Sequence, residues 1–169
     1  MPERDAGVST MAMTESAAQL SAPIKKDAGT LQQYGALAWR RSKRGEVKIL
    51  LITSRERKRW IVPKGWPIKG KTPARTAARE AFEEAGVIGD AQAEAIGAYH
   101  YVKILRDGTE ADCRVVLFGL EVRGTLLNWP ERAERTRQWL TVPEAATTVS
   151  DTGLAEILRE LQSDRDVLG

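Results

Sequence analysis

Three glutamates, Glu80, Glu83 and Glu84, stand close together on one predicted helix, directly after a loop rich in proline and glycine. Residues three and four positions apart on a helix are neighbours, so the spacing predicts that the three carboxylates converge on one spot. Clustered carboxylates repel one another unless a cation lies among them. Hard divalent cations such as Mg²⁺ prefer oxygen ligands and often bind together with substrate phosphates. The pattern favours metal-dependent phosphate chemistry over its alternative, a solvated acidic face on a surface helix.

The helix that carries these glutamates has clear start and stop signals. Thr72 is the expected N-cap, and Pro73 is the expected first residue, where its missing N–H costs nothing. Gly86 is expected to end the helix. The predicted buried stripe consists of Ala74, Ala77, Ala78, Ala81, Phe82 and Ala85.

Short runs rich in valine, leucine and isoleucine surround this helix and predict a sheet. The expected strands are 34–39, 47–53, 96–105, 113–122 and 138–142, with an extended piece at 60–63. Turns are expected around Gly45 and at Asp107-Gly108, and 65–70 is expected to be loop. A helical turn is expected at 143–147, and a last helix from Asp151 to about Gln162.

A chain of 169 residues is predicted to form one folded domain, here residues 31–169, after a disordered tail at 1–30. No apolar run approaches the ~20 residues of a membrane helix, so no membrane partner is expected. The single cysteine, Cys113, excludes an internal disulfide and is expected to be a small core residue. A cytoplasmic location is therefore expected. The sequence does not indicate an oligomeric state.

The net charge of +3 conceals an uneven distribution. Residues 35–75 contain thirteen basic and two acidic side chains, which gives this stretch a net charge of +11. A field of one sign raises the local concentration of oppositely charged ligands. A polyanionic substrate is therefore expected, although some of these lysines and arginines are expected only to solvate a surface.

The stretch 65–87 resembles the Nudix box. The box has glycine, five residues, glutamate, seven residues, and then Arg-Glu-aliphatic-any-Glu-Glu-any-Gly-aliphatic. Every specified position matches here, from Gly65 to Val87, except the first glutamate, which is Lys71. The resemblance implies an α/β/α sandwich with a mixed β-sheet. Segments outside the box are similar to the diphosphoinositol polyphosphate phosphohydrolase and diadenosine polyphosphate hydrolase branch. They are 54–55, 60–63, 128–129, 135–139 and 143–145.

This resemblance implies hydrolysis of a diphosphate linkage by water, with Mg²⁺ or Mn²⁺ as the cofactor. By the same resemblance, the metal ligands are Glu80, Glu83, Glu84 and the carbonyl oxygen of Gly65, and Arg79 orients the glutamates. Glu80 is the preferred general base. Bases outside the box occur in the family, and the nearby candidates here are Asp112, Glu110 and Glu121. Ser54, Arg55 and Lys64 are expected to contact substrate phosphates, and Trp66 is expected either to stack on a base or to pack.

Lys71 departs from the box pattern, because its ammonium group cannot accept a hydrogen bond from Arg79. Arg79 is therefore expected to bond Glu83, Glu84 or a backbone carbonyl. Lys71 itself is expected to turn outward and contact substrate phosphate. The alternative is that it weakens the box by repelling Arg79.

Three functions remain open at this point. The leading one is hydrolysis of a polyphosphorylated small molecule, either a diadenosine polyphosphate or a diphosphoinositol polyphosphate. The basic stretch also fits removal of pyrophosphate from RNA 5′ ends. The third is a non-catalytic nucleotide-binding module of the Nudix type, which only Lys71 supports.

Overall fold

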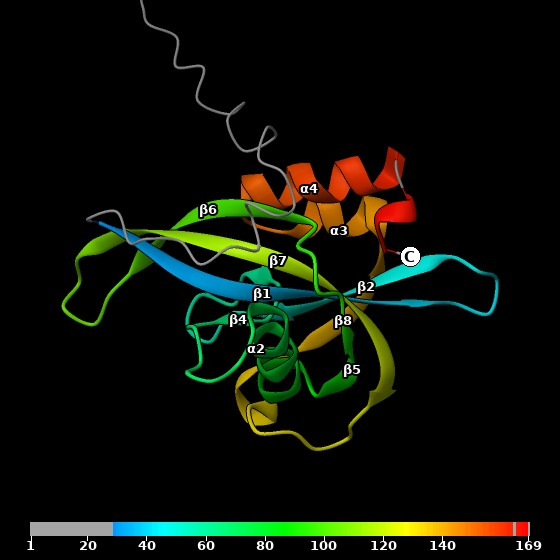
Figure 1. The fold of residues 1–169 in the computed structure, drawn as a ribbon, viewed down its shortest axis with the longest axis horizontal. Helices are drawn as coiled ribbons and strands as arrows, with labels where there is room; N and C mark the ends of the chain where they lie inside the picture. The colour runs from blue at the N-terminus through cyan, green and yellow to red at the C-terminus, as the bar shows by residue number, and fades with distance from the viewer. Residues whose placement is uncertain (1–28, 164, 169) are drawn as a thin grey trace, which may run out of the picture.

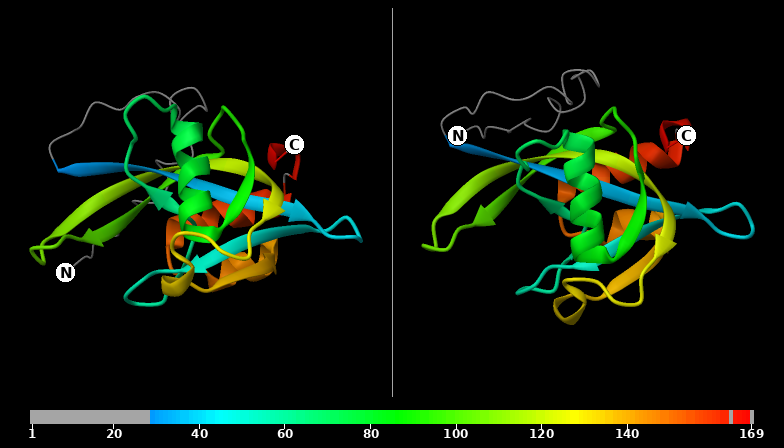
Figure 2. Two further views of the ribbon diagram at one scale, coloured as in Figure 1. Left: turned by 90° about the horizontal axis from the view of Figure 1, so that it is seen from below. Right: turned by 60° about the horizontal axis from the view of Figure 1, so that its bottom comes forward.

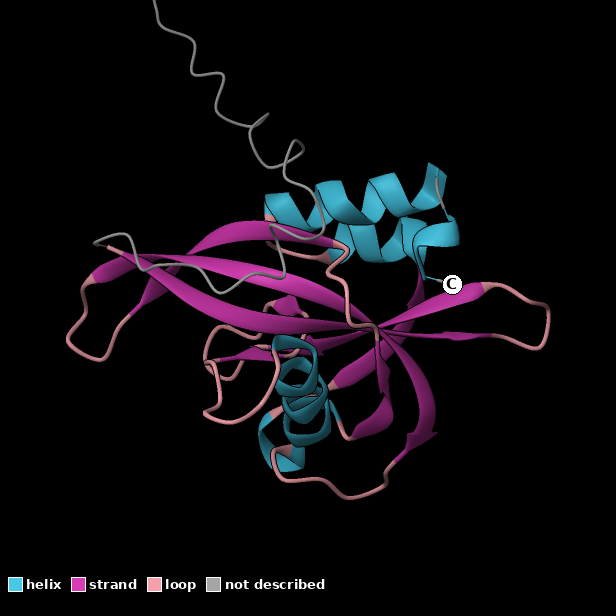
Figure 3. Cartoon of the chain, viewed as in Figure 1, coloured by secondary structure: helices cyan, strands magenta, loops and turns pink. Residues whose placement is uncertain are grey.

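The computed structural model describes residues 29–163 and 165–168. A mixed β-sheet with helices on both faces forms its centre (Figure 1, Figure 3). The strands are β1 (Thr30–Arg41), β2 (Val47–Thr53), β3 (Trp60–Ile61), β4 (Lys64–Gly65), β5 (Val87–Ala91), β6 (Gly97–Ile104), β7 (Glu110–Thr125) and β8 (Arg137–Thr141). The helices are α2 (Pro73–Glu80), α3 (Val142–Thr148) and α4 (Thr152–Ser163), with short helical pieces at η2 (Ala81–Ala85), η3 (Arg132–Glu134) and η4 (Arg165–Leu168).

The sheet runs in the order β3-β2-β1-β7-β5, and β6 also pairs with β7, β8 with β2, and β4 with β1. Strands β1 and β7 are parallel, whereas the other pairs are antiparallel. Helix α2 lies on one face, and α3 and α4 lie together on the other (Figure 1; Figure 2 shows α2 crossing the sheet). The predicted α/β/α sandwich with a mixed sheet is confirmed.

Two apolar layers explain the unbroken hydrophobic run of β2. Leu50 and Ile52 pack in the layer beneath α2, while Ile49 and Leu51 pack in the layer beneath α3 and α4. Successive side chains of a strand point to opposite faces, so a strand covered on both sides is apolar throughout. Cys113 is fully buried, as expected.

Most predicted elements are present, with three differences. Strand β1 begins at Thr30, four residues before the predicted start, and the remainder of the predicted tail, residues 1–28, lies outside the described residues. Strand β5 follows Gly86 immediately and was not predicted, because VIGDA is short and contains glycine. Gly65, the first residue of the expected loop 65–70, pairs together with Lys64 as the two-residue strand β4 against β1.

The helix that carries the glutamates begins and ends at the predicted residues, but its last turn has a different form. The Thr72 hydroxyl accepts a hydrogen bond from the Arg75 N–H at 3.2 Å, and Pro73 is the first helical residue. After Glu80 the backbone widens into a π turn over 81–85, and Gly86 ends it with a φ of 66°. A π turn contains more residues per turn than an α-helix. Residue i+4 therefore stays on the same side of the helix as residue i, whereas residue i+3 points to another side.

Candidate active site

A cavity of about 660 Å³ opens where β4, the end of the box helix, β6 and the 126–136 loop meet. Six of the predicted site residues line it: Ser54, Arg55, Lys64, Gly65, Glu80 and Glu84. The other three, Lys71, Arg79 and Glu83, are not among the lining residues. Glu80 and Glu84 therefore share the cavity while Glu83 lies outside it, which is the arrangement that the π turn favours.

Gly65 lies directly against the carboxyl group of Glu80. A Cβ atom added to Gly65 would overlap all three atoms of the Glu80 carboxyl group. The absence of a side chain at residue 65 is therefore what lets this carboxylate reach the wall of the cavity. Burial raises the pKa of Glu80, and the negative charges of Glu83 and Glu131 raise it further.

The Glu84 carboxylate is buried and held from two sides. Its Oε2 accepts a hydrogen bond from the backbone N–H of Lys64 at 3.2 Å, and its Oε1 lies 3.2 Å from Nη2 of Arg135. Burial raises the pKa of Glu84 to about 7, although the charges of Arg135 and Lys64 oppose the shift. Glu84 is thus a carboxyl group whose charge the fold only partly compensates.

Two residues at the centre of this site, Glu131 and Arg135, were not singled out as site residues by the sequence. Both line the cavity, and Arg135 lies 3.1 Å from Oε1 of Glu131 as well as bonding Glu84. They come from the loop and the η3 turn, some 50 residues after the box. The segment 135–139 was noticed only as a resemblance, and no spacing rule links it to Glu84.

Arg79 bonds Glu83, one of the partners expected when Lys71 replaced the usual glutamate. Its Nε donates to Oε1 of Glu83 at 2.9 Å, one helical turn away. Lys71 is exposed at the loop before α2 and does not line the cavity. Its expected contact with substrate phosphate stays a prediction that the cavity does not support.

The general-base candidates outside the box also lie away from the cavity. Asp112 is exposed on β7 and lies 3.0 Å from Nδ1 of His100, and Glu110 and Glu121 are exposed on the same strand. None of the three lines the cavity. Apart from Glu80 and Glu84, the lining carboxylates are Glu56, Glu131 and Asp151.

Four cationic side chains line the cavity and form no ion pair with any carboxylate of the described residues: those of Arg57, Arg59, Lys64 and Lys103. The Lys64 ammonium lies 5.0 Å from the ring centre of Tyr101, and that of Lys103 lies 5.4 Å from the ring centre of Trp66. Burial lowers the pKa of Lys64, although Glu84 and Asp151 oppose the shift. The cavity therefore combines these four cations with its five lining carboxylates.

The donor set fits a hard cation of the Mg²⁺ type. Within the described residues, no three acidic, histidine or cysteine side chains converge closely enough to form a complete metal site. Mg²⁺ is usually bound by one or two carboxylates together with water and substrate phosphate, and does not need such a cage. Glu80, Glu84 and the carbonyl of Gly65 would supply the protein ligands, and the structure does not bring the predicted third carboxylate, Glu83, to the cavity.

The metal-free protein is expected to lose stability as the pH rises, and Glu84→Gln is expected to lose less. The folded-state pKa of Glu84, about 7, lies above its ordinary 4.5. Its contribution to stability is therefore fully present below pH 4.5 and is lost as the pH rises through 7. The free energy of unfolding is measured with urea in EDTA at about pH 5.5 and pH 8. Between these two pH values the wild type should lose about 2 kcal/mol more than the variant. An equal loss of unfolding free energy in wild type and Glu84→Gln would contradict the raised pKa of Glu84.

The family of the chain follows from comparison with known proteins. A family model described as the NUDIX domain matches residues 31–161, which include the whole cavity. The chain belongs to the NUDIX domain family. Among the described residues, no helix is long and apolar enough to cross a membrane.

Curated relatives and a solved structure agree with this assignment. The chain is 32% identical over 127 residues to "Nudix hydrolase 12, mitochondrial" of Arabidopsis thaliana, covering 71% of this chain and 63% of the relative. It is 31% identical over 107 residues to "Diphosphoinositol polyphosphate phosphohydrolase 3-alpha" of Mus musculus, covering 62% and 61%. The first three curated relatives are matched over 52% to 64% of their own length.

An Ap4A hydrolase of C. elegans has a similar fold. Its TM-score is 0.58 at 17% identity, covering 79% of this chain and 97% of that one. At this identity the likeness shows the shared fold and leaves the substrate open.

Proposed function

We propose that this NUDIX protein hydrolyses diphosphate linkages in a polyphosphorylated small molecule, either a diadenosine polyphosphate or a diphosphoinositol polyphosphate. The observation that carries the proposal is the cavity itself, which places Glu80 and Glu84 beside four cationic side chains that form no ion pair with a carboxylate of the described residues. A relative named as a diphosphoinositol polyphosphate phosphohydrolase and a structural neighbour named as an Ap4A hydrolase support the same two substrate classes.

The residues that line the cavity have different roles in this reaction. The four cationic side chains bind phosphate oxygens and hold the chain of phosphates against the acidic wall. Mg²⁺ or Mn²⁺ held by Glu80, Glu84 and Gly65 would neutralise phosphate charge and acidify a bound water. Glu80, whose carboxylate lines the cavity beside Gly65, takes the proton of the attacking water.

A substrate panel tests this function. The protein is incubated with Mg²⁺ and, in parallel, diadenosine polyphosphates, nucleoside triphosphates, diphosphoinositols and triphosphorylated RNA, with EDTA as the control. Turnover of the first or third class, abolished by EDTA, is the expected result. Preferred turnover of RNA with a steep salt dependence would instead support 5′ pyrophosphate removal. Binding of nucleotide without any turnover would instead support the third hypothesis, a non-catalytic nucleotide-binding module.

The double variant Arg57→Gln/Arg59→Gln is expected to weaken binding of long phosphate chains most. These arginines line the cavity and form no ion pair with a carboxylate of residues 29–163 and 165–168, so each is available to a phosphate oxygen. The KM for a hexaphosphate-containing substrate should rise about tenfold, with a smaller change for a diphosphate. Added salt should shrink the wild-type preference.

The control for this experiment removes the same charge elsewhere. Lys43→Gln/Arg44→Gln deletes two exposed cations from the β1–β2 turn, which does not line the cavity. If both double variants raise the KM equally, the effect belongs to net charge, and the assignment of Arg57 and Arg59 to substrate binding is wrong.

A further inference from the structure

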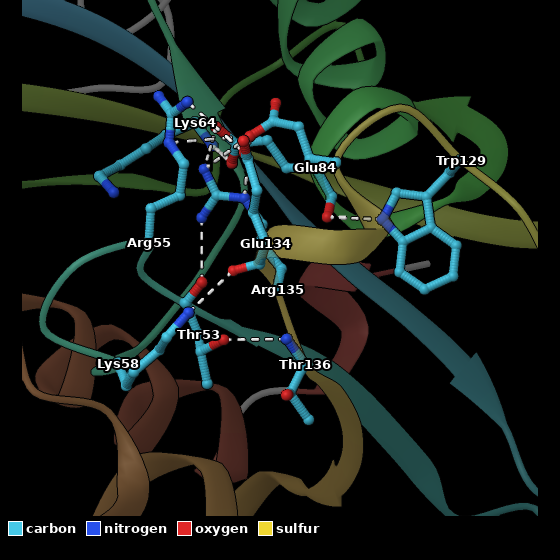
Figure 4. Close-up of polar contacts among 10 residues, drawn as sticks. Thr53, Arg55, Lys58, Lys64, Glu84, Trp129, Glu134, Arg135 and Thr136 are labelled. Carbon is cyan, nitrogen blue, oxygen red and sulfur yellow. Dashed lines mark hydrogen bonds and ion pairs between the residues drawn. The ribbon is translucent and has the colours of Figure 1, made fainter.

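Arg135 is an arginine buried within an acidic cluster, with only 5% of its side chain exposed. Its Nε and Nη2 lie 3.1 Å from Oε1 of Glu131, and Nη2 also lies 3.2 Å from Oε1 of Glu84. Its Nη1 donates to the backbone carbonyl of Thr53 at 3.0 Å. Figure 4 shows the guanidinium between Glu84 and Thr53. All three nitrogens are thus engaged with the protein.

The backbone around Arg135 fixes its position. The next residue is locked to the end of β2, because Thr136 N donates to Oγ1 of Thr53 at 2.9 Å and Thr53 N donates to the Thr136 carbonyl at 3.0 Å. At the other end of the loop, Trp129 Nε1 donates to the Glu84 carbonyl at 3.1 Å (Figure 4). The arginine and the glutamate that it contacts therefore belong to two segments that are tied together independently of their side chains.

This arrangement supplies the cation that the cluster needs. Glu80, Glu84 and Glu131 line one cavity, and like charges in a partly buried site repel one another strongly. A permanently charged guanidinium, with its planar set of donors, bonds two carboxylates and a carbonyl at once, which a lysine ammonium cannot match in direction. The cluster can therefore assemble before any metal binds.

We propose that Arg135 is the positioning residue of this active site, fixing the Glu84 carboxylate so that its remaining lone pairs face the cavity. The Arg135 guanidinium forms an ion pair with Oε1 and the Lys64 N–H donates to Oε2, which together orient the plane of the carboxylate. Each oxygen keeps a second lone pair for a ligand. The role of Glu84 in turnover rests on the proposed function, whereas its orientation by Arg135 does not.

Arg135→Lys tests the proposal while keeping the charge. It is expected to lower kcat about 10- to 100-fold while changing KM less than about threefold, as is typical when a partner that orients a metal ligand is lost. Mn²⁺ affinity, measured by calorimetry without substrate, should fall by a similar factor. In Arg135→Gly, millimolar guanidinium should restore about tenfold or more of the lost turnover, because it refills the vacated position.

The matched control is Arg132→Lys, an exposed arginine three residues earlier whose Nη1 bonds Asn128 outside the cavity. It should retain wild-type kcat and Mn²⁺ affinity. Circular dichroism and thermal unfolding in EDTA establish that each variant is folded.

Several results would overturn the proposal. A folded Arg135→Lys protein with wild-type Mn²⁺ affinity and kcat would remove the positioning role. A large rise in KM at constant kcat would make Arg135 a substrate contact. If no substrate of the panel is turned over by the wild type, the proposed function fails, but the calorimetry still decides whether Arg135 orients Glu84.

Discussion

Replacing Glu84 with glutamine is expected to lower turnover by about three orders of magnitude while leaving the protein folded. The carboxylate lies buried in the wall of the cavity, with one oxygen on the Lys64 N–H and the other on Arg135. Glutamine keeps the size of the side chain but removes the charge that a divalent cation and its bound phosphate require. Initial rates at saturating Mg²⁺ on the best substrate of the panel provide the measurement.

Folding has to be separated from chemistry in this experiment. Because the carboxyl group is buried with a raised pKa, the neutral side chain should not destabilise the metal-free protein at pH 8. Glu94→Gln is the control, since Glu94 is exposed and does not line the cavity. Turnover within tenfold of wild type in Glu84→Gln would show that this carboxylate is not part of the catalytic machinery.

Gly65→Ala is expected to abolish most of the activity with little loss of stability. The added Cβ overlaps the carboxyl group of Glu80, which is the far end of a flexible side chain and can turn aside. The backbone of Gly65 needs no positive φ, so alanine is not strained there. Displacing the catalytic carboxylate by about 1 Å is enough to cost about 100-fold in rate.

The control for Gly65→Ala is the same substitution at a glycine outside the cavity, Gly124. Gly124 on β7 has open space where a Cβ would lie and also has no positive φ. Gly124→Ala should therefore match the wild type in kcat and in thermal unfolding. If Gly65→Ala keeps full turnover, or if it unfolds like a core mutant, the contact with Glu80 does not have the role assigned to it.

The sequence predicted the elements well where their signals are local. The Thr72-Pro73 start, the strand 47–53 and the Asp107-Gly108 turn all depend on residues within a few positions of one another, and all are present. The π turn was not predicted, because its widened backbone depends on packing and bonding beyond the helix. That one difference separates Glu83 from the cavity that Glu80 and Glu84 share.

In the candidate site, too, the residues with local sequence signals were predicted and those brought in from distant segments were not. The box spacing indicated Gly65, Glu80 and Glu84, which the structure brings to one cavity. It could not indicate Glu131 and Arg135, because their nearness to the box arises from the return of the chain along β7. Arg135 lies in the charged stretch 131–137, and no sequence pattern there separates a buried counterion from a surface charge.

The parallel pairing of β1 with β7 also has a consequence for how the protein acquires its structure. Thr30 pairs with Asp112 and Trp39 with Glu121, so the first strand has its longest neighbour only after most of the chain has been made. Contacts so distant in sequence close slowly, because the entropy of a long loop is lost before the contacts are gained. The edge of β1 that pairs with β7 therefore stays open during synthesis, and this edge is where early protection from aggregation matters most.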